Sequence, residues 1–252
     1  MPGLRILLAE DNAANQDLAV RRLARAGHQV TVAPNGCVAL DLLERERFDL
    51  MLLDVQMPVL DGLTTAAAVR RHEKLTGGHL PIIALTASDS AGDADRCAAA
   101  GMDACAFKPI DWPHLFQLID VVVAGARAPA GPAAPQTPAP TESEVLNQAG
   151  LQQNFGDDPT LFHQIVTLFR SEKSRRLAEI QQALATADAL RVERSSHSLR
   201  GALGTLCALR AMHAAGVVEA AARADHLDAA ARAYDVLVAE VEAVMLELER
   251  LV

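Results

Sequence analysis

Between residues 4 and 124, five short apolar runs alternate with stretches of helical periodicity, and this alternation limits the possible folds more than any other feature. It predicts a parallel sheet with helices on both faces, because parallel strands are joined by helical crossovers. The run Asp-Leu-Met-Leu-Leu at 49–53 is apolar without alternation, as in a strand buried on both sides. Strands are expected near 4–9, 28–33, 49–53, 80–85 and 103–107, with helices near 13–26, 36–46, 61–75, 91–101 and 111–124.

The chain changes character twice after this region. Residues 125–141 carry prolines at 129, 132, 135, 138 and 140 among alanines, which is typical of a linker that lets its flanking domains move. Beyond 141 the strand signals stop, and helices are expected near 143–154, 158–186, 188–207, 209–223 and 225–250. The sequence thus predicts an α/β domain over 1–124, a Pro/Ala-rich linker over 125–141, and an all-α antiparallel helical bundle over 142–252.

Composition excludes several classes of protein. The net charge is −9 over 252 residues, so neither half has the basic surface that nucleic-acid binding requires. No apolar stretch approaches the roughly 18 residues of a membrane-spanning helix, and the N-terminus has no leader pattern, so we expect a cytoplasmic protein without membrane contact. The four cysteines form no CxxC pair and are expected to be reduced core residues rather than zinc ligands or disulfides; they are Cys37, Cys97, Cys105 and Cys207.

Polar side chains stand at the ends of four of the five predicted strands. Glu10 and Asp11 follow the first strand and Asp54 the third, while Thr86 and Lys108 follow the fourth and fifth. The carboxyl ends of parallel strands meet at one edge of the sheet, so we expect these side chains to converge. Three converging carboxylates repel one another without a cation, and their oxygen ligands suit Mg²⁺.

This set matches the requirements of phosphoryl transfer to a carboxylate. Asp54 would be the nucleophile, Glu10 and Asp11 would anchor the metal, and Thr86 and Lys108 would donate to the phosphoryl oxygens. A hydrolase of the haloacid dehalogenase type is the competing interpretation. It needs a second carboxylate two residues after the nucleophile, where this chain has Gln56.

Residues 4–124 closely resemble the receiver domain of bacterial two-component systems. The resemblance rests on Glu10-Asp11-Asn12, Asp54-Val55-Gln56-Met57-Pro58-Val59-Leu60-Asp61-Gly62, Leu85-Thr86-Ala87 and Lys108-Pro109. It implies a flavodoxin-like doubly wound fold, a Mg²⁺ ligand from the Gln56 backbone carbonyl, and a reorganisation around the fourth helix and fifth strand when Asp54 is phosphorylated. One position departs from the pattern, because Cys105 stands where receivers carry a switch aromatic.

A second candidate acceptor is His197, inside the helix expected at 188–207. Helical geometry puts an apolar stripe on one side of this helix and His197 roughly 150° away from it, which predicts that the imidazole faces solvent. The stripe consists of Leu199, Leu203 and Leu206. Gly201 and Gly204 lie near the histidine face, where bare backbone would let a partner approach closely. Arg200 on the flank could hold phosphoryl oxygens.

The run His197-Ser198-Leu199-Arg200-Gly201 resembles the motif of the histidine phosphotransfer domain, and the resemblance spans about 145–250. Arg200 replaces the usual lysine of that motif, which keeps the charge but changes its geometry.

Together the two resemblances imply a phosphorelay signal transduction protein with an aspartate and a histidine acceptor. The sequence contains no Gly-rich ATP loop, so a sensor histidine kinase would supply the phosphoryl group and a downstream receiver domain would be the other partner. One alternative is a non-catalytic adaptor whose bundle binds a partner under control of Asp54 phosphorylation. Another is the C-terminal part of a hybrid sensor kinase, although Met1 directly before the receiver pattern favours a free-standing protein. The oligomeric state and the direction of phosphoryl flow stay open.

Overall fold

The computed structural model describes residues 3–86, 91–125, 144–156 and 158–251. The chain divides into two compact units, Met1–Thr137 and Pro138–Val252, which are described separately below. The linker expected at 125–141 lies outside the described residues except for Gly125. Among the helices of the described ranges, none combines the length and the apolar character that crossing a membrane requires.

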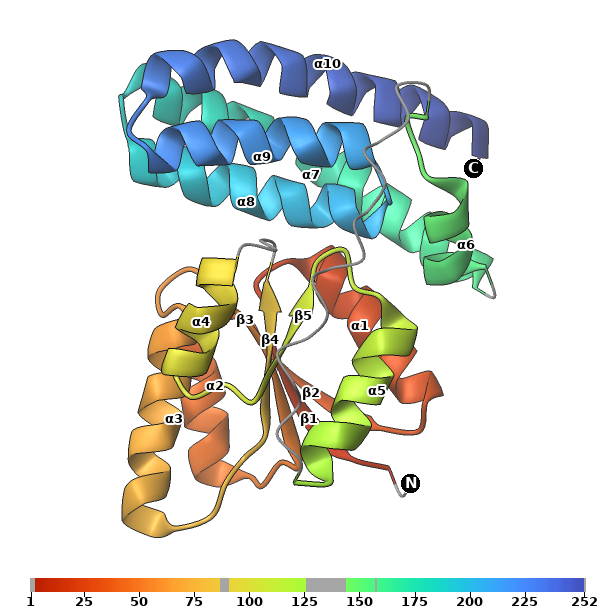
Figure 1. The fold of residues 1–252 in the computed structure, drawn as a ribbon. Coiled ribbons are helices and arrows are strands. Elements are labelled where there is room, and N and C mark those ends of the chain that lie inside the picture. The colour runs from red at the N-terminus through yellow and green to blue at the C-terminus, as the bar shows by residue number, and fades with distance from the viewer. Residues whose placement is uncertain (1–2, 87–90, 126–143, 157, 252) are drawn as a thin grey trace. The chain divides into compact units, whose positions relative to one another are not determined.

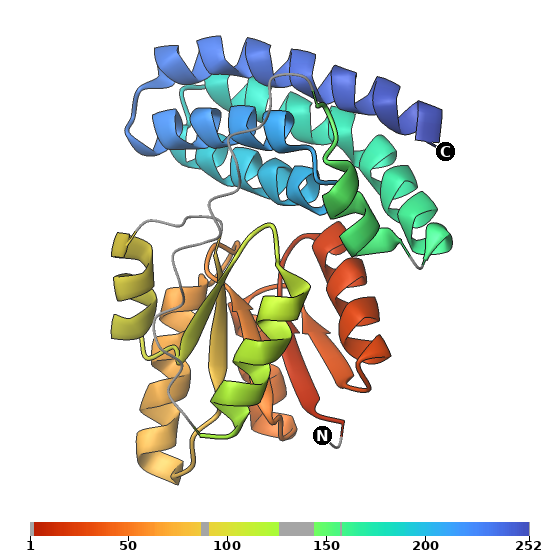
Figure 2. The ribbon, with the colours of Figure 1, turned by 45° about the vertical axis from the view of Figure 1, so that its right-hand side comes forward.

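The first unit is a five-stranded parallel sheet in the order β2-β1-β3-β4-β5, which is the strand order of flavodoxin-like folds. Its strands are β1 (Arg5–Ala9), β2 (Gln29–Ala33), β3 (Leu50–Asp54), β4 (Ile82–Thr86) and β5 (Ala104–Phe107). The covering helices are α1 (Ala13–Arg25), α2 (Gly36–Arg45), α3 (Gly62–Thr76), α4 (Ala91–Ala99) and α5 (Trp112–Val123). α1 and α5 lie on one face of the sheet and α2, α3 and α4 on the other (Figure 1, Figure 2). The predicted α/β class and flavodoxin-like fold are therefore confirmed.

Burial explains why the sheet is ordered in this way. All five residues of β3 and all five of β4 are buried, as expected for inner strands covered on both faces. The edge strands β2 and β5 carry more partly exposed residues. Leu52 pairs with both Leu8 of β1 and Ile83 of β4, which puts the end of β3 at the centre of the sheet's carboxyl edge.

Capping side chains fix the short loops at this edge. Asn12 accepts from the backbone N–H groups of Ala14 and Asn15 at the start of α1, and Asp61 caps α3 in the same way. Gly62 follows Asp61, and a Cβ atom there would lie 2.2 Å from the backbone oxygen of Asp54. Only glycine therefore lets α3 begin this close to the end of β3.

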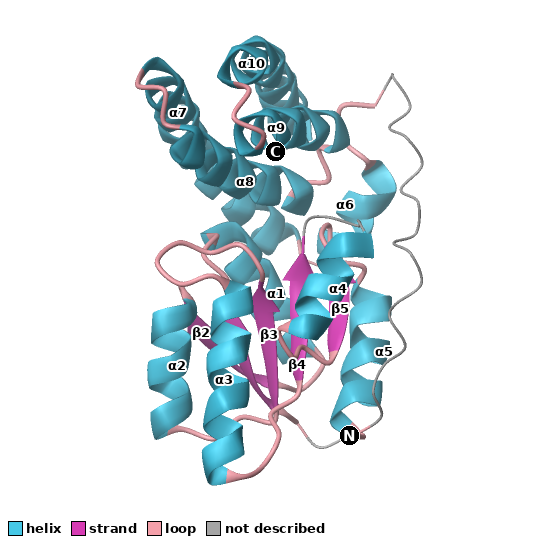
Figure 3. Cartoon of the chain, turned by 60° about the vertical axis from the view of Figure 1, so that its left-hand side comes forward, coloured by secondary structure: helices cyan, strands magenta, loops and turns pink. Residues whose placement is uncertain are grey.

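The second unit is a helical bundle, in agreement with the predicted all-α class. Its helices are α6 (Gln148–Phe155), α7 (Pro159–Ala185), α8 (Ala189–Thr205), α9 (Leu209–Arg223) and α10 (Leu227–Leu251). α8 packs against α7 and α9, and α10 packs against α9 and α7 (Figure 3). The first helix was expected to begin at 143 but begins at Gln148, because the Asn147 side chain caps it by accepting from the Gly150 N–H at 2.8 Å.

The connections between the four long helices share one turn geometry. Each contains a non-glycine residue with positive φ, namely Ala187 (53°), Cys207 (53°) and Asp225 (60°). In the first turn the N–H of Ala187 donates to Leu184 and that of Asp188 to Ala183, which satisfies the last carbonyls of α7. The apolar stripe predicted on α8 is confirmed, because Leu199, Leu203 and Leu206 are all 0% exposed.

Candidate functional site

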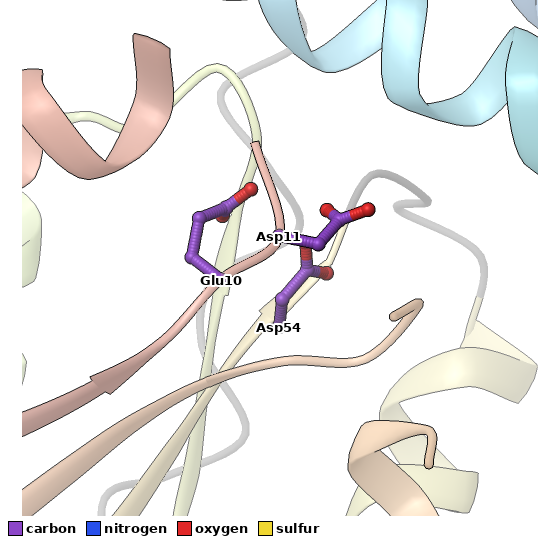
Figure 4. A group of neighbouring side chains, drawn as sticks. All are labelled: Glu10, Asp11 and Asp54. Carbon is purple, nitrogen blue, oxygen red and sulfur yellow. The ribbon is translucent and has the colours of Figure 1, made fainter. Parts of the chain in front are cut away.

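The structure gathers three carboxylates at the carboxyl edge of the sheet, where the sequence predicts them. Glu10 and Asp11 follow β1, and Asp54 is the last residue of β3 (Figure 4). One carboxylate oxygen from each lies within 4.8 Å of the others. Glu10 and Asp54 are buried and Asp11 is partly exposed, so the cluster is open to solvent on the Asp11 side.

Lys108 balances part of this negative charge. Its Nζ donates to Asp54 Oδ2 at 2.6 Å and to Glu10 Oε2 at 2.7 Å. The Lys108 N–H also donates to the carbonyl of Thr86 at 2.7 Å, which anchors the loop after β5 to the end of β4. Three carboxylates and one ammonium leave a net charge of −2 at this edge (−3 + 1 = −2).

The charges change the pKa values of the groups that carry them. Burial raises the pKa of Glu10, Lys108 opposes this shift, and the neighbouring Asp54 charge adds to it. Burial alone would lower the pKa of Lys108, but the carboxylates of Asp54 and Glu10 raise it well above its ordinary value. Lys108 is therefore held as an ammonium ion at the carboxylate that is expected to react.

The remaining contacts orient the two buried carboxylates. Asp54 Oδ1 accepts from the backbone N–H of Gln56 at 3.1 Å. Glu10 Oε1 accepts from the Asn12 N–H at 3.2 Å and from Asn15 Nδ2 at 2.9 Å. Every oxygen of these two side chains thus has a fixed donor.

Thr86 lies at the end of β4, beside the strand that ends at Asp54. The carboxylate cluster of Glu10, Asp11 and Asp54 has the ligand atoms that a hard cation prefers. Thr86 ends β4 and is buried, and β4 pairs with β3 through Asp54 and Leu85. An all-oxygen cluster with a surplus of two negative charges is the donor set that Mg²⁺ prefers. The structure therefore brings the five predicted residues of the aspartate site to one edge of the sheet.

The second site differs from the prediction in one respect. His197 lies near the middle of α8, but it is only 8% exposed and does not face open solvent. Helical periodicity alone predicts that every residue outside the leucine stripe is exposed to solvent. In the structure, α9 packs along this flank of α8 and covers it. Gly204 is also buried, so the expected open backbone on the histidine face is limited to the partly exposed Gly201.

Glu219 of α9 holds the imidazole. Its Oε1 lies 3.3 Å from His197 Nδ1, and its Oε2 lies 3.2 Å from Arg200 Nε. Arg223, one turn further along α9, donates from Nη2 to Glu219 Oε1 at 2.6 Å and from Nε to Glu193 at 2.8 Å. Burial alone would raise the pKa of Glu219, but the hydrogen bond and charge of His197, with the charges of Arg200 and Arg223, lower it.

Sequence reasoning missed Glu219 and Arg223. A signal was present, because Glu219 interrupts the run of small apolar residues from 214 to 222 and falls among positions that face inward. A carboxylate that is 1% exposed must be paired, and its partners are His197 and Arg200 of α8 and Arg223 of its own helix. Without the packing of α8 on α9, the pattern could not identify which groups Glu219 would contact.

Comparison with known proteins identifies both halves of the chain. Residues 6–120 match the family model of the response regulator receiver domain, and residues 164–247 match that of the Hpt domain. The chain is 37% identical over 124 residues to hybrid signal transduction histidine kinase I of Dictyostelium discoideum, covering 47% of this chain and 7% of that protein. It is 31% identical over 208 residues to the virulence sensor protein BvgS of Bordetella pertussis, covering 79% of this chain and 16% of that protein.

The chain therefore spans less than a fifth of the length of these relatives. Among solved structures, it is similar to the receiver domain of a sensor histidine kinase from Pseudomonas aeruginosa, which contains a magnesium ion in its active-site cleft. That match has 36% identity and a TM-score of 0.45, and covers 48% of this chain and 98% of the other.

Proposed function

Since this chain joins a response regulator receiver domain to an Hpt, or histidine phosphotransfer, domain, we propose that it relays phosphoryl groups through Asp54 and His197. The observation that carries the proposal is the Lys108 ammonium, 2.6 Å from Asp54 Oδ2 beside the carboxylates of Glu10 and Asp11. The adaptor alternative is not favoured, because both halves match phosphoryl-acceptor domains.

At the aspartate site, the Asp54 carboxylate attacks the phosphorus of a phosphohistidine. The new O–P bond forms as the N–P bond breaks, and the released imidazole keeps the electron pair. The Lys108 ammonium is placed to pair with the negative charge that develops on one phosphoryl oxygen, and the Thr86 hydroxyl donates a hydrogen bond to another. Glu10, Asp11, Asp54 and the Gln56 backbone carbonyl would hold Mg²⁺, which supplies neutralisation of the phosphoryl oxygens when bound.

At the histidine site, Glu219 fixes which ring nitrogen reacts. With Nδ1–H donating to Glu219 Oε1, the lone pair lies on Nε2, which is then the nucleophile toward an aspartyl phosphate. Transfer forms the N–P bond at Nε2 and breaks the O–P bond of the acyl phosphate. Arg200 lies one turn along α8, and its guanidinium, anchored by Glu219, is the proposed partner of the phosphoryl oxygens.

The proposed partners follow from this chemistry. A sensor histidine kinase would donate to Asp54, and His197 would exchange with Asp54 or with the receiver of another protein. The cytoplasmic location expected from the sequence stays a prediction.

The test is to incubate the full chain with acetyl phosphate and Mg²⁺ and to follow base-labile and base-stable phosphate. We expect base-labile label in wild type that is lost in Asp54→Asn, and base-stable label that is lost in His197→Gln. His213→Gln is the matched control, because His213 is an exposed histidine on α9. A chain that binds Mg²⁺ but takes no label, either from acetyl phosphate or from a histidine kinase, would contradict the proposal.

A further inference from the structure

Two cysteines of the receiver domain lie in contact on facing elements. Cys97 belongs to α4 and is 1% exposed, while Cys105 belongs to β5 and is partly exposed. Both are free thiols, and their side chains are hydrogen-bonded to each other. Both also pack into the same apolar cluster, on the face of the sheet covered by α2, α3 and α4.

Strand pairing at Cys105 and the turn that follows α4 fix the contact between Cys97 and Cys105. Cys105 pairs with Ala84 of β4, so both side chains point to the same face of the sheet, and Ala84 belongs to the cluster that contains Cys97. The Met102 N–H donates to the Cys97 carbonyl at 3.0 Å and closes the end of α4. Gly101 supplies the left-handed φ of 90° that turns the chain toward β5. The two thiols are thus held together by backbone structure on both sides.

The pair has the properties of an attacking and a resolving thiol. Burial opposes ionisation of Cys105, but the hydrogen bond from its neighbour has the larger effect, so the Cys105 pKa is lowered. A thiolate that a small oxidant can reach is the form that peroxides attack. Cys97, buried directly beside it, is the thiol that can capture the oxidised sulfur.

We propose that Cys97 and Cys105 form a peroxide-responsive disulfide that fastens α4 to β5. The Cys105 thiolate attacks a peroxide oxygen, the O–O bond breaks, and Cys105 becomes a sulfenic acid while hydrogen peroxide yields water. The Cys97 thiol then displaces that oxygen, which leaves as a second water, and the S–S bond forms. The two sulfurs are oxidised by two electrons in total, and one peroxide is reduced.

The other two cysteines do not share this environment. Burial raises the pKa of Cys207 to about 12, so it is a thiol at neutral pH and a poor nucleophile toward peroxide. Cys37 is exposed and can form disulfides between molecules, which a substitution at that position removes. Selective oxidation at Cys97 and Cys105 is therefore expected in the Cys37→Ser chain.

The experiment treats the full-length Cys37→Ser chain with hydrogen peroxide, alkylates the remaining thiols under denaturing conditions, and analyses the product by mass spectrometry. The expected product has lost two hydrogen atoms, retains one alkylatable thiol at Cys207, and yields a peptide that joins Cys97 to Cys105. Dithiothreitol should restore all three thiols. The additional variant Cys207→Ser should still form the disulfide.

Two further variants separate the steps of the proposal. In Cys97→Ala, a sulfenic-acid probe should label Cys105 to a greater final extent than in the parent, because no resolving thiol consumes the sulfenic acid. The oxidation itself should be slower, because the hydrogen bond that lowers the Cys105 pKa is lost. In Cys105→Ser, Cys97 should stay alkylatable after the same treatment. A peroxide-treated parent that keeps all its thiols, or that oxidises Cys105 to sulfinic acid without joining it to Cys97, would overturn the proposal.

Discussion

Lys108 Nζ lies 2.6 Å from Asp54 Oδ2, although Lys108 follows the edge strand β5 and Asp54 ends the inner strand β3, 54 positions earlier in the sequence. The same ammonium contacts Glu10 Oε2 at 2.7 Å. One side chain therefore holds together two buried carboxylates that would otherwise repel each other. The stability of this edge of the sheet and the phosphoryl transfer that we propose at Asp54 therefore involve the same contact.

Lys108→Met should destabilise the metal-free protein by about 3 kcal/mol near neutral pH, because it leaves two buried carboxylates without their cation. Burial already raises the pKa of Glu10, and loss of Lys108 removes the charge that opposes this shift. A group with a raised folded-state pKa binds more protons when folded, so the free energy of unfolding of the variant should recover as the pH falls. Urea unfolding at two pH values measures both effects.

Lys173→Met is the control for that comparison. Lys173 donates to Glu242 at 2.8 Å, but Glu242 is more than half exposed, so its removal should cost less than about 1 kcal/mol. If the two methionine variants lost equal stability, the contact of Lys108 with the carboxylates would contribute no more than a surface ion pair.

Mg²⁺ should stabilise the wild-type chain and have little effect on Asp11→Asn. The Asp11 carboxylate completes a cluster whose oxygens lie within 4.8 Å of one another, and its partial exposure leaves it accessible to a hydrated ion. At a concentration 100 times the dissociation constant, binding raises the free energy of unfolding by about 2.7 kcal/mol. Thermal unfolding with Mg²⁺ and with a chelator measures this shift.

Asp17→Asn serves as the matched control, because Asp17 is an exposed acid on the nearby helix α1. It should respond to Mg²⁺ as wild type does. An unchanged Mg²⁺ response in Asp11→Asn would exclude this carboxylate as a ligand.

The sequence predicted that Glu10, Asp11, Asp54 and Lys108 lie together at one edge of the sheet, for a physical reason. These groups follow directly from strand ends, and parallel strands bring those ends together whatever the loops do. The predicted strands agree with the observed ones to within two residues, and the continuous apolar runs of β3 and β4 end at the polar residues Asp54 and Thr86. At this site, the local sequence pattern is therefore enough to predict which side chains lie together in the folded domain.

The histidine site was predicted less completely because it depends on contacts between helices. The periodicity of α8 identifies its buried stripe but contains no information on which helix covers the opposite flank. The burial of His197 and its contact with Glu219 arise from the packing of α9 on α8. Cys37 is a similar case, since it was expected in the core but is exposed on α2.

Glu219→Gln should weaken the bundle at neutral pH and reduce its sensitivity to acid. The pKa of Glu219 is lowered from its ordinary value of 4.5, so its contribution to stability is complete above that pH and is lost as the pH falls through the folded-state value. At neutral pH the variant should lose about 2 kcal/mol, because His197, Arg200 and Arg223 lose a buried anionic partner. Calorimetry of the full chain at pH 7 and near pH 3 measures the difference in stability between wild type and Glu219→Gln.

The difference in the free energy of unfolding between wild type and Glu219→Gln should be smaller at the lower pH. Glu193→Gln is the control, since Glu193 contacts the half-exposed Arg223 and not the histidine. A gap of constant size at both pH values would mean that the charge of Glu219 does not stabilise the folded bundle.

Ala187→Gly should stabilise the second unit, although glycine normally weakens helical proteins. Ala187 has a φ of 53°, just beyond the C-terminus of α7, and its exposed side chain makes no core contact that would be lost. Left-handed backbone costs a non-glycine residue about 1 kcal/mol, which the substitution removes, and the greater freedom of glycine in the unfolded chain offsets part of this gain in stability.

Ala185→Gly provides the matched comparison two residues earlier, where the exposed alanine is still helical and the same substitution should destabilise the bundle. Opposite shifts of the bundle's melting temperature are expected for the two variants in calorimetry of the full chain, and shifts of the same sign would contradict the assigned turn geometry.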